Sequence, residues 1–310
     1  TVNVNSEGNG GSGTDDDTIL KEQKEILSNV MGQSQIMHAM LAVPDVNATV
    51  DYWKRRGATL QDYRSSRNAE TAFVGFSDLF SDTGFFSLEI VTLANDAILN
   101  VGNAISHFGL SMLLDLDLEK AAAGESPAST SLTDVDPNGI QVRSVAAAPG
   151  DPFSRFCLRT AAGGAANGDE EEDDLLAKTI EFYEQLGMTV VAGDETCTCL
   201  RYTTTQQEDS TLQREGVAMA LSFERRPDAE DNIDLDIGNC FDHFAFSTRN
   251  VDVATEALRA IFRSQGSGED DISTFIFMEP VRMFGMKLVG LYDPNGYKVY
   301  LVEDPKLTKN

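Results

Sequence analysis

Basic residues are scarce in this chain of 310 residues, which has 24 lysines and arginines against 50 aspartates and glutamates. The formal net charge is therefore −26. Because the phosphate backbone of nucleic acids is bound mainly through lysine and arginine, this charge argues against nucleic acid or an anionic membrane surface as a partner. Long apolar runs are lacking as well, since none approaches the roughly 18 residues needed to span a bilayer. We therefore expect no membrane insertion.

Cysteine is also sparse, with Cys157, Cys197, Cys199 and Cys240 as the whole set. So few cysteines in a long chain favour reduced, mostly buried thiols over a disulfide scaffold. Cys197 and Cys199 would point to the same side of a strand, but a zinc site there would need two further ligands. The sequence therefore favours buried thiols over a metal site at these positions.

Position 1 is threonine and not methionine. One interpretation is a processed form, located in the cytoplasm or, after removal of a transit peptide, in an organelle such as a plastid or mitochondrion. Residues 1–17 contain almost no apolar side chain, so they predict a disordered tail. Residues 18–34 have apolar side chains at helical spacing and predict a helix that caps a domain or docks on a protein partner.

Histidine occurs three times, and every copy stands at the start of a short apolar run. The three are His38, His107 and His243. Short apolar runs that end in turn residues predict mostly buried β-strands. The first run is followed by an amphipathic segment, residues 47–56, which predicts a helix. A strand that begins with histidine and precedes a helix is thus the recurring element of the sequence.

This strand-helix pattern divides the chain from residue 35 onward into four units. The units begin at His38, His107, Arg155 and His243. The first has the order β-α-β-β-β, and the second and fourth both end in an Asp-Pro-Asn-Gly turn. Four units in two pairs indicate an internal duplication. We assign two units each to domains 35–150 and 151–304, followed by a polar tail at 305–310.

Two segments depart from the common pattern. The second unit is short, and its residues 118–123 (Leu118–Ala123) predict a helix of only one or two turns. The third unit has an acidic insertion rich in glycine and alanine at residues 161–174, which we expect to be a solvated loop. Gly57 and Gly187 follow the first and third predicted helices, where glycine commonly ends a helix.

Taken in order, these motifs resemble the vicinal oxygen chelate superfamily, and most closely glyoxalase I (lactoylglutathione lyase) in a four-module fused form. The motifs are His38-Ala39-Met40-Leu41-Ala42-Val43, Phe86-Ser87-Leu88-Glu89-Ile90, Ser106-His107-Phe108-Gly109 and Asp293-Pro294-Asn295-Gly296-Tyr297-Lys298. The resemblance covers roughly residues 35–303. It implies an α+β fold in which tandem βαβββ modules form two curved mixed sheets, with module one facing module four and module two facing module three.

The resemblance also implies a metal held by four side chains, two from each of two facing modules. At the first such location it places His38, Glu89, His243 and Tyr300. Two imidazoles and one carboxylate with open coordination positions suit a divalent metal, zinc or nickel in the first place. The alternative reading of Tyr300 is a side chain that fills the barrel, and a lone histidine at a strand start is often only a hydrogen-bonded structural residue.

The second location has a different set of side chains. The same placement puts Arg155, Ala220, His107 and Arg143 there. Arginine cannot be deprotonated and offers no lone pair to a metal. We therefore expect this location to be a cation-rich pocket without metal, and the protein to have one intact and one degenerate site.

The glyoxalase reaction moves a proton between adjacent carbons, so it needs a base beside the metal. The family's usual base sits where this chain has Tyr300, and a neutral phenol is a poor base. Glu89 is the alternative base, which makes Glu89 and Tyr300 the candidate catalytic residues. Arg282 and Lys287 lie in a segment that we expect to form a loop near the site and to offer positive charge.

Glutathione is a candidate cosubstrate because of the resemblance, but the residues at the family's glutathione contacts differ. These positions hold Ala42, Leu93 and Asn239. The leading hypothesis is a metal-dependent lyase or isomerase of the glyoxalase I type that acts on a small α-carbonyl, hemithioacetal-type substrate. The alternatives are a non-catalytic binding or assembly protein with the same fold and, third, an Fe(II) dioxygenase, since two histidines and one carboxylate also suit that chemistry.

Overall fold

The computed structural model describes residues 13–67, 69–76, 86–94, 97–110, 133–144, 153–160, 175–193, 197–202, 219–225, 235–264, 275–283 and 285–307. The expected short helix at residues 118–123 and the acidic insertion at residues 161–174 lie outside these ranges. The described helices are α1 (Gly13–Met31), α2 (Val46–Lys54), α4 (Leu175–Gln185) and α5 (Val251–Ser264). No helix among the described residues is long and apolar enough to cross a membrane.

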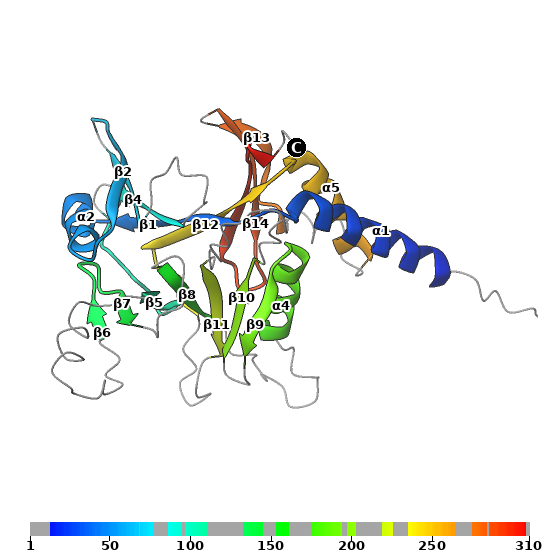
Figure 1. The fold of residues 1–310 in the computed structure, drawn as a ribbon, viewed down its shortest axis with the longest axis horizontal. Coiled ribbons are helices and arrows are strands. Elements are labelled where there is room, and N and C mark those ends of the chain that lie inside the picture. Colours follow the sequence, from blue (N-terminus) through cyan, green and yellow to red (C-terminus); the bar gives the residue numbers. More distant parts are fainter. Residues whose placement is uncertain are drawn as a thin grey trace, which may run out of the picture.

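The strands form two mixed sheets, which lie one above the other in Figure 1. The eight-stranded sheet has the order β13 (Met278–Met283), β14 (Met286–Tyr292), β15 (Lys298–Glu303), β12 (Phe241–Thr248), β1 (Ile36–Val43), β4 (Ser87–Thr92), β3 (Glu70–Gly75) and β2 (Thr59–Ser65). The seven-stranded sheet has the order β6 (Thr133–Val135), β7 (Gln141–Ser144), β5 (Ile105–Leu110), β8 (Phe153–Thr160), β11 (Ala220–Arg225), β10 (Cys197–Arg201) and β9 (Thr189–Gly193).

Each sheet joins two of the four units at an antiparallel central pair. β1 pairs with β12, which joins modules one and four, and β5 pairs with β8, which joins modules two and three. The predicted α+β fold with two curved mixed sheets and this module pairing is confirmed. Each sheet therefore takes one module from residues 35–150 and one from residues 151–304.

The main core lies between the two sheets and is rich in aromatic rings. Phe156 on β8 lies 4.5 Å from Phe108 on β5 and 4.9 Å from Phe244 on β12, measured between ring centroids. Trp53 on α2 packs against Phe108 at 5.6 Å. Edge-to-face contacts of this kind add to the stabilisation from buried area. Because side chains alternate along a strand, the opposite faces of the two sheets point away from this core.

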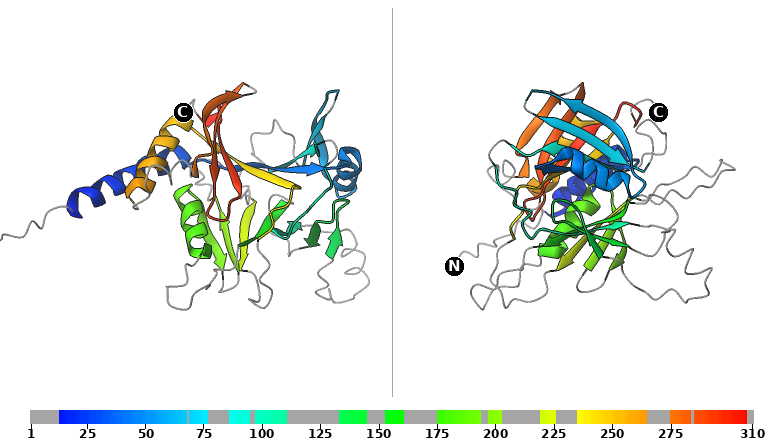
Figure 2. Two further views of the ribbon diagram at one scale, coloured as in Figure 1. Left: turned by 180° about the vertical axis from the view of Figure 1, so that it is seen from behind. Right: turned by 90° about the vertical axis from the view of Figure 1, so that its left-hand side faces the viewer.

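In β1 this alternation determines which side chains face away from the core and are available to bind a ligand. Ala39, Leu41 and Val43 are fully buried on the core side. His38 and Met40 point to the other face and are partly exposed. We call the side of each sheet away from the core its outer face. Figure 2 shows the eight-stranded sheet curving so that its end strands β2 and β13 rise on either side of its central strands.

The two Asp-Pro-Asn-Gly turns fix the helices of neighbouring modules. Asn138 donates a hydrogen bond through Nδ2 to Thr49 on α2 at 3.2 Å, and Asn295 donates one to Thr179 on α4 at 2.8 Å. In both turns the aspartate Oδ1 accepts hydrogen bonds from backbone N–H groups two and four residues further on. Such aspartate turns satisfy backbone donors locally. The turn of module two thus anchors the helix of module one, and the turn of module four anchors that of module three.

The N-terminal helix α1 begins at Gly13, before the expected start at residue 18. Once a helix is nucleated, adding a residue costs little, so a polar segment can continue it. Leu27 and Met31 are buried, and the Val30 carbonyl accepts a hydrogen bond from the backbone N–H of Arg249 at 3.1 Å. The helix therefore docks against the junction between β12 and α5.

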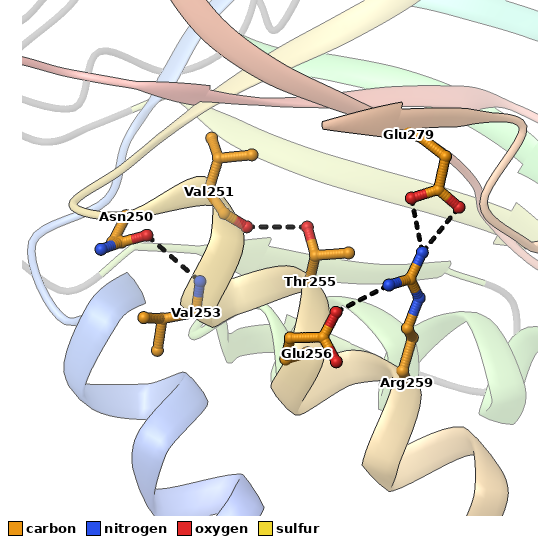
Figure 3. A network of polar contacts seen from close by, with 7 residues as sticks. All are labelled: Asn250, Val251, Val253, Thr255, Glu256, Arg259 and Glu279. Carbon is orange, nitrogen blue, oxygen red and sulfur yellow. Dashed lines mark hydrogen bonds and ion pairs between the residues drawn. The ribbon is translucent and has the colours of Figure 1, made fainter. Parts of the chain in front are cut away.

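A polar network joins α5 to the edge strand β13 (Figure 3). Asn250 caps α5 by accepting a hydrogen bond from the Val253 backbone N–H at 3.1 Å. Arg259 donates to Glu256 at 2.7 Å and to Glu279 on β13 at 2.6 Å. Both glutamates are exposed, so these ion pairs contribute little stability and serve mainly to orient β13.

Four strands were not expected from the sequence, namely β6, β9, β13 and β14. Every residue of β9 is exposed, so the alternation that marks a half-buried strand is absent. β13 is an edge strand and contains Pro280, which a central strand would not tolerate. Arg282 and Lys287 lie on β13 and β14 in cross-strand register, so the prediction that they lie in a loop was wrong. Lys287 instead forms an ion pair with Asp252 on α5.

Candidate metal centre

Three of the predicted site residues meet on the outer face of the eight-stranded sheet. His38 lies on β1, Glu89 on β4 and His243 on β12, and these strands are direct neighbours. Met40 on β1 is in register with both Glu89 and His243. Because cross-strand partners point to one face, and because His38 is two residues before Met40, all three side chains share that face.

The distances between these side chains suit a shared ion. His38 Nε2 lies 3.1 Å from Glu89 Oε2 and 3.3 Å from His243 Nε2. One ligand atom from each of the three residues lies within 4.8 Å of the other two. Imidazole nitrogen and carboxylate oxygen are ligands that zinc and nickel accept. The structure therefore brings together three of the four residues that the resemblance places at the first location.

Asp242 holds the His243 ring, and sequence reasoning missed it. Asp242 Oδ2 lies 2.8 Å from His243 Nδ1, and its Oδ1 accepts a hydrogen bond from Lys298 Nζ at 2.7 Å. A carboxylate at Nδ1 keeps the proton on that nitrogen and leaves the Nε2 lone pair for a cation. The hydrogen bond with His243, followed by that from Lys298, lowers the pKa of Asp242 to about 2 against the opposing effect of burial.

Asp242 can contact the ring of His243, the next residue in the chain, because Asp242 lies in a β-bulge. Between the pairs Met40–His243 and Leu41–Phe241, β12 has one residue more than β1, and that residue is Asp242. A bulge re-aims the side chain of the extra residue. The same irregularity occurs directly before the ligand position of every module. The extra residues are Met37, Ser106, Ser154 and Asp242. The sequence alone does not reveal these bulges, because a bulge is defined by the pairing with the partner strand.

The charge states of the cluster fit cation binding. Burial would raise the pKa of Glu89, but the hydrogen bond with His38 and the charges of His38 and His243 lower it overall. Burial lowers the pKa of His243, and this effect outweighs the hydrogen bond with Asp242. At neutral pH Glu89 is therefore ionised and His243 neutral, which are the forms that coordinate a metal.

Tyr300 lies next to the cluster. Its ring packs edge-on against the His243 imidazole, with 4.5 Å between the centroids. Burial, followed by the charge of Asp242, raises the pKa of the phenol. Tyr300 therefore keeps its proton at neutral pH, so it can donate a hydrogen bond but is a poor base.

The second location lies on the outer face of the seven-stranded sheet. Gly109 is in register with both Arg143 and Arg155, as Met40 is with Glu89 and His243. The choice of Ala220 at this location was wrong by two residues. Ala220 is in register with Arg155, whereas Ser222, in register with Cys157, corresponds to Glu89. A shift of two residues keeps the same face, so the alternation in the sequence could not exclude it.

A carboxylate is present at the second location, which the sequence did not predict. Glu224 Oε1 lies 3.9 Å from His107 Nδ1, and Ser106 donates a hydrogen bond to Glu224 Oε2 at 2.7 Å. Burial, followed by the charges of Arg143, Arg155 and Arg159, lowers the pKa of His107 to about 4 against the opposing effect of Glu224. The neighbourhood of His107 is thus rich in cations, as expected, but includes an acidic group.

Solved structures match the chain, although no protein-family model and no curated protein does. A variant of glyoxalase I from Zea mays has a TM-score of 0.65 and 20% identity, covering 90% of this chain and 96% of that chain. Glyoxalase I from Zea mays has a TM-score of 0.61 and 20% identity, with 87% and 92% covered. A putative dioxygenase from Bacillus subtilis subsp. subtilis str. 168 has a TM-score of 0.55 and 12% identity, with 89% and 86% covered.

At identities this low, the structural similarity shows a common fold but does not show a common activity. The likeness nevertheless extends over almost the whole length of both chains, so it covers all four modules and both sheets. Together with the order of strands in the two sheets, it shows that this chain has the same fold as glyoxalase I.

Proposed function

We propose that this protein is a metal-dependent lyase or isomerase of the glyoxalase I type, in which His38, Glu89 and His243 hold one divalent cation. The observation that supports it is the convergence of two imidazoles and one carboxylate from three strands, with ligand atoms within 4.8 Å of one another. Among the described residues this cluster supplies three ligands. Coordination positions then stay open for a substrate, as a catalytic site requires.

A cation held by these residues supplies Lewis-acid polarisation to the adjacent oxygens of a small α-carbonyl substrate, such as a hemithioacetal. We assign proton transfer to Glu89. Its Oε2 faces His38, and we assign to its Oε1 the removal of a proton from the carbon next to the carbonyl. Tyr300 keeps its proton and is suited to donate a hydrogen bond to a substrate oxygen. Proton return from Glu89 to the neighbouring carbon, together with transfer of the hydroxyl proton from one substrate oxygen to the other, completes the isomerisation.

The test uses metal-free protein reloaded with zinc or nickel and the hemithioacetal of methylglyoxal and glutathione. We expect turnover that needs the added metal. His243→Ala should abolish it, and Glu89→Gln should lower it by at least about 100-fold, because a neutral amide cannot accept the proton. Glu256→Gln, which changes an exposed carboxylate on α5, is the control and should leave turnover intact. If the cluster takes up metal but the hemithioacetal is not converted, the lyase assignment is wrong.

A second candidate, a non-catalytic binding protein with the same fold, is favoured by the residues at the expected glutathione contacts. Asn239 is engaged within the fold: its Nδ2 donates to the Ile98 carbonyl at 3.0 Å, and its Oδ1 accepts from the Asn100 backbone N–H at 2.8 Å. Leu93 is nearly buried. Metal uptake without turnover of any tested α-carbonyl compound would favour this candidate, and metal-dependent oxygen consumption after loading with Fe(II) would favour a dioxygenase.

A further inference from the structure

Three of the four cysteines gather on the outer face of the seven-stranded sheet. Cys157 on β8 and Cys199 on β10 are both in register with Ser222 on β11, the strand between them. Cys197 on β10 is in register with Glu224 on β11. Because cross-strand partners point to one face, all these side chains lie on the face that also carries His107.

Three of these side chains converge. His107, Cys157 and Glu224 each offer a ligand atom within 4.8 Å of the other two. Cys197 lies outside this three-residue group but next to it, because it is the cross-strand partner of Glu224 and can approach as a fourth ligand. His107 and Cys157 are buried, whereas Glu224 and Cys197 are partly exposed, so an ion can reach the group from the solvent.

We propose that His107, Cys157, Glu224 and Cys197, which we call the thiol site, bind a thiophilic divalent cation, and zinc in the first place. One imidazole, one carboxylate and two thiolates make a four-ligand set of the kind found in tetrahedral zinc sites. Both thiols must lose their protons to the solvent on binding, so two protons leave for each cation bound. This inference does not depend on the proposed lyase function, since it concerns the other sheet.

The surrounding charges match such a complex. Zinc with two thiolates, one carboxylate and a neutral imidazole has one net negative charge. Arg143, Arg155 and Arg159 act electrostatically on His107, so their positive charges can offset this negative charge. The sequence predicted a location without metal because it counted arginines among the ligands. In the structure the ligands are instead thiols, a carboxylate and an imidazole, and the arginines would help to balance the negative charge of their complex with zinc.

A disulfide explains the arrangement less well than a bound ion. Cys157 and Cys197 lie on strands separated by β11, so their Cα atoms are farther apart than those of residues on adjacent strands. Disulfides need Cα atoms within about 7 Å. An ion between the two sulfurs spans a wider gap than a direct S–S bond, because each Zn–S bond is about 2.3 Å long.

The thiol site also has a supporting contact and a consequence for the fold. Ser106, the extra residue of the β5 bulge, donates a hydrogen bond to Glu224 at 2.7 Å and thereby orients the carboxylate. The four ligands come from β5, β8, β11 and β10, that is, from modules two and three. A bound cation would therefore join the two halves of the seven-stranded sheet. With four protein ligands it would be a structural ion and not a catalytic one.

Cobalt distinguishes this site from the candidate metal centre, because only cobalt bound to thiolate gives a thiolate-to-cobalt charge-transfer band. We would titrate metal-free, reduced full-length protein with Co²⁺ and then displace it with Zn²⁺. The wild type should develop the band, and zinc should remove it. Cys157→Ser and Glu224→Gln should lose or greatly weaken the band, and Ser106→Ala should weaken binding by about 10- to 100-fold. Cys240→Ser, which changes a buried cysteine outside the group, is the matched control and should keep it.

His243→Ala separates the two sites, since it should keep the charge-transfer band while losing the metal at the candidate metal centre. If Cys157→Ser does not fold, the partly exposed Cys197→Ser and Glu224→Gln decide the question. Absence of the band in the wild type would overturn the proposal, as would an undiminished band in folded Cys197→Ser and Glu224→Gln variants. Neither result would count against the lyase proposal, because that proposal depends on metal bound at His38, Glu89 and His243.

Discussion

Asp242→Asn tests how the His243 ring is held at the candidate metal centre. The carboxylate is 2.8 Å from His243 Nδ1 and 2.7 Å from Lys298 Nζ. Because its pKa is lowered to about 2, chiefly by the hydrogen bond with His243, it is charged at neutral pH and accepts the Nδ1 proton. Asparagine has the same size, but its NH₂ group can face Nδ1 and favour the other tautomer. In that tautomer Nε2 carries the proton and cannot bind a cation.

The size of the effect follows from the role of Asp242 as an outer partner of a ligand. Losing such a partner weakens metal binding by about 10- to 100-fold, which corresponds to roughly 1.4–2.7 kcal/mol. We expect the upper half of this range, because the side chain is only 32% exposed and solvent screens it little. The assay is a zinc titration of metal-free protein in competition with a chromophoric chelator, in the Cys157→Ser background so that the thiol site does not contribute.

Asp62→Asn is the control for this experiment. Asp62 pairs with Arg64 on the exposed strand β2, where its side chain is 36% exposed, and its loss should leave zinc affinity unchanged. A folded Asp242→Asn variant that binds zinc as tightly as its parent would refute the argument from the tautomer. A loss of affinity in both variants would point to a general effect of charge.

Three further predictions concern stability and the fourth ligand position. Gly238→Ala should destabilise the fold by at least about 2 kcal/mol in urea titrations, since φ is +67° and a Cβ would lie 2.2 Å from the Asn100 carbonyl oxygen. Gly285→Ala, at φ +82° with nothing within 4 Å, should cost only about 1 kcal/mol. Burial raises the pKa of Asp293 to about 7, so its contribution to stability is full below about pH 4 and is lost as pH rises through 7. Asp293→Asn should therefore gain stability relative to the wild type between pH 5 and 8, and equal pH slopes would contradict this. Tyr300→Glu should tighten zinc binding at the candidate metal centre by supplying a fourth ligand, and unchanged affinity would show that position 300 faces away from the ion.

Much of the fold could be predicted because it is encoded locally. The strand with His38 alternates between buried and partly exposed residues, and the turn at Asp45 caps the next helix by accepting a hydrogen bond from the Ala48 backbone N–H. Both signals lie within a few residues of one another. By contrast, β9 is exposed throughout, so no periodicity marks it. Its strand conformation comes from pairing with β10, which the local sequence does not specify.

The candidate site could be predicted only as far as it follows the repeat. His38 and His243 stand at repeated strand starts, and the resemblance to the vicinal oxygen chelate superfamily placed them with Glu89 at one location. Asp242 was missed because its direction depends on a bulge against β1. Ala220 was chosen in place of Ser222 because two residues on one face of a strand have the same pattern, and only pairing with β8 distinguishes them.

The bulges explain how one architecture came to hold two different sets of side chains. Each bulge places its extra residue directly before the ligand position of its module. On one sheet that residue is Asp242, which orients an imidazole for a cation with open coordination. On the other it is Ser106, which orients Glu224 toward His107 and the thiol of Cys157. Open coordination suits chemistry, whereas four protein ligands suit structure. In our two proposals, the same backbone irregularity thus supports a reactive site in one sheet and a cross-linking ion in the other.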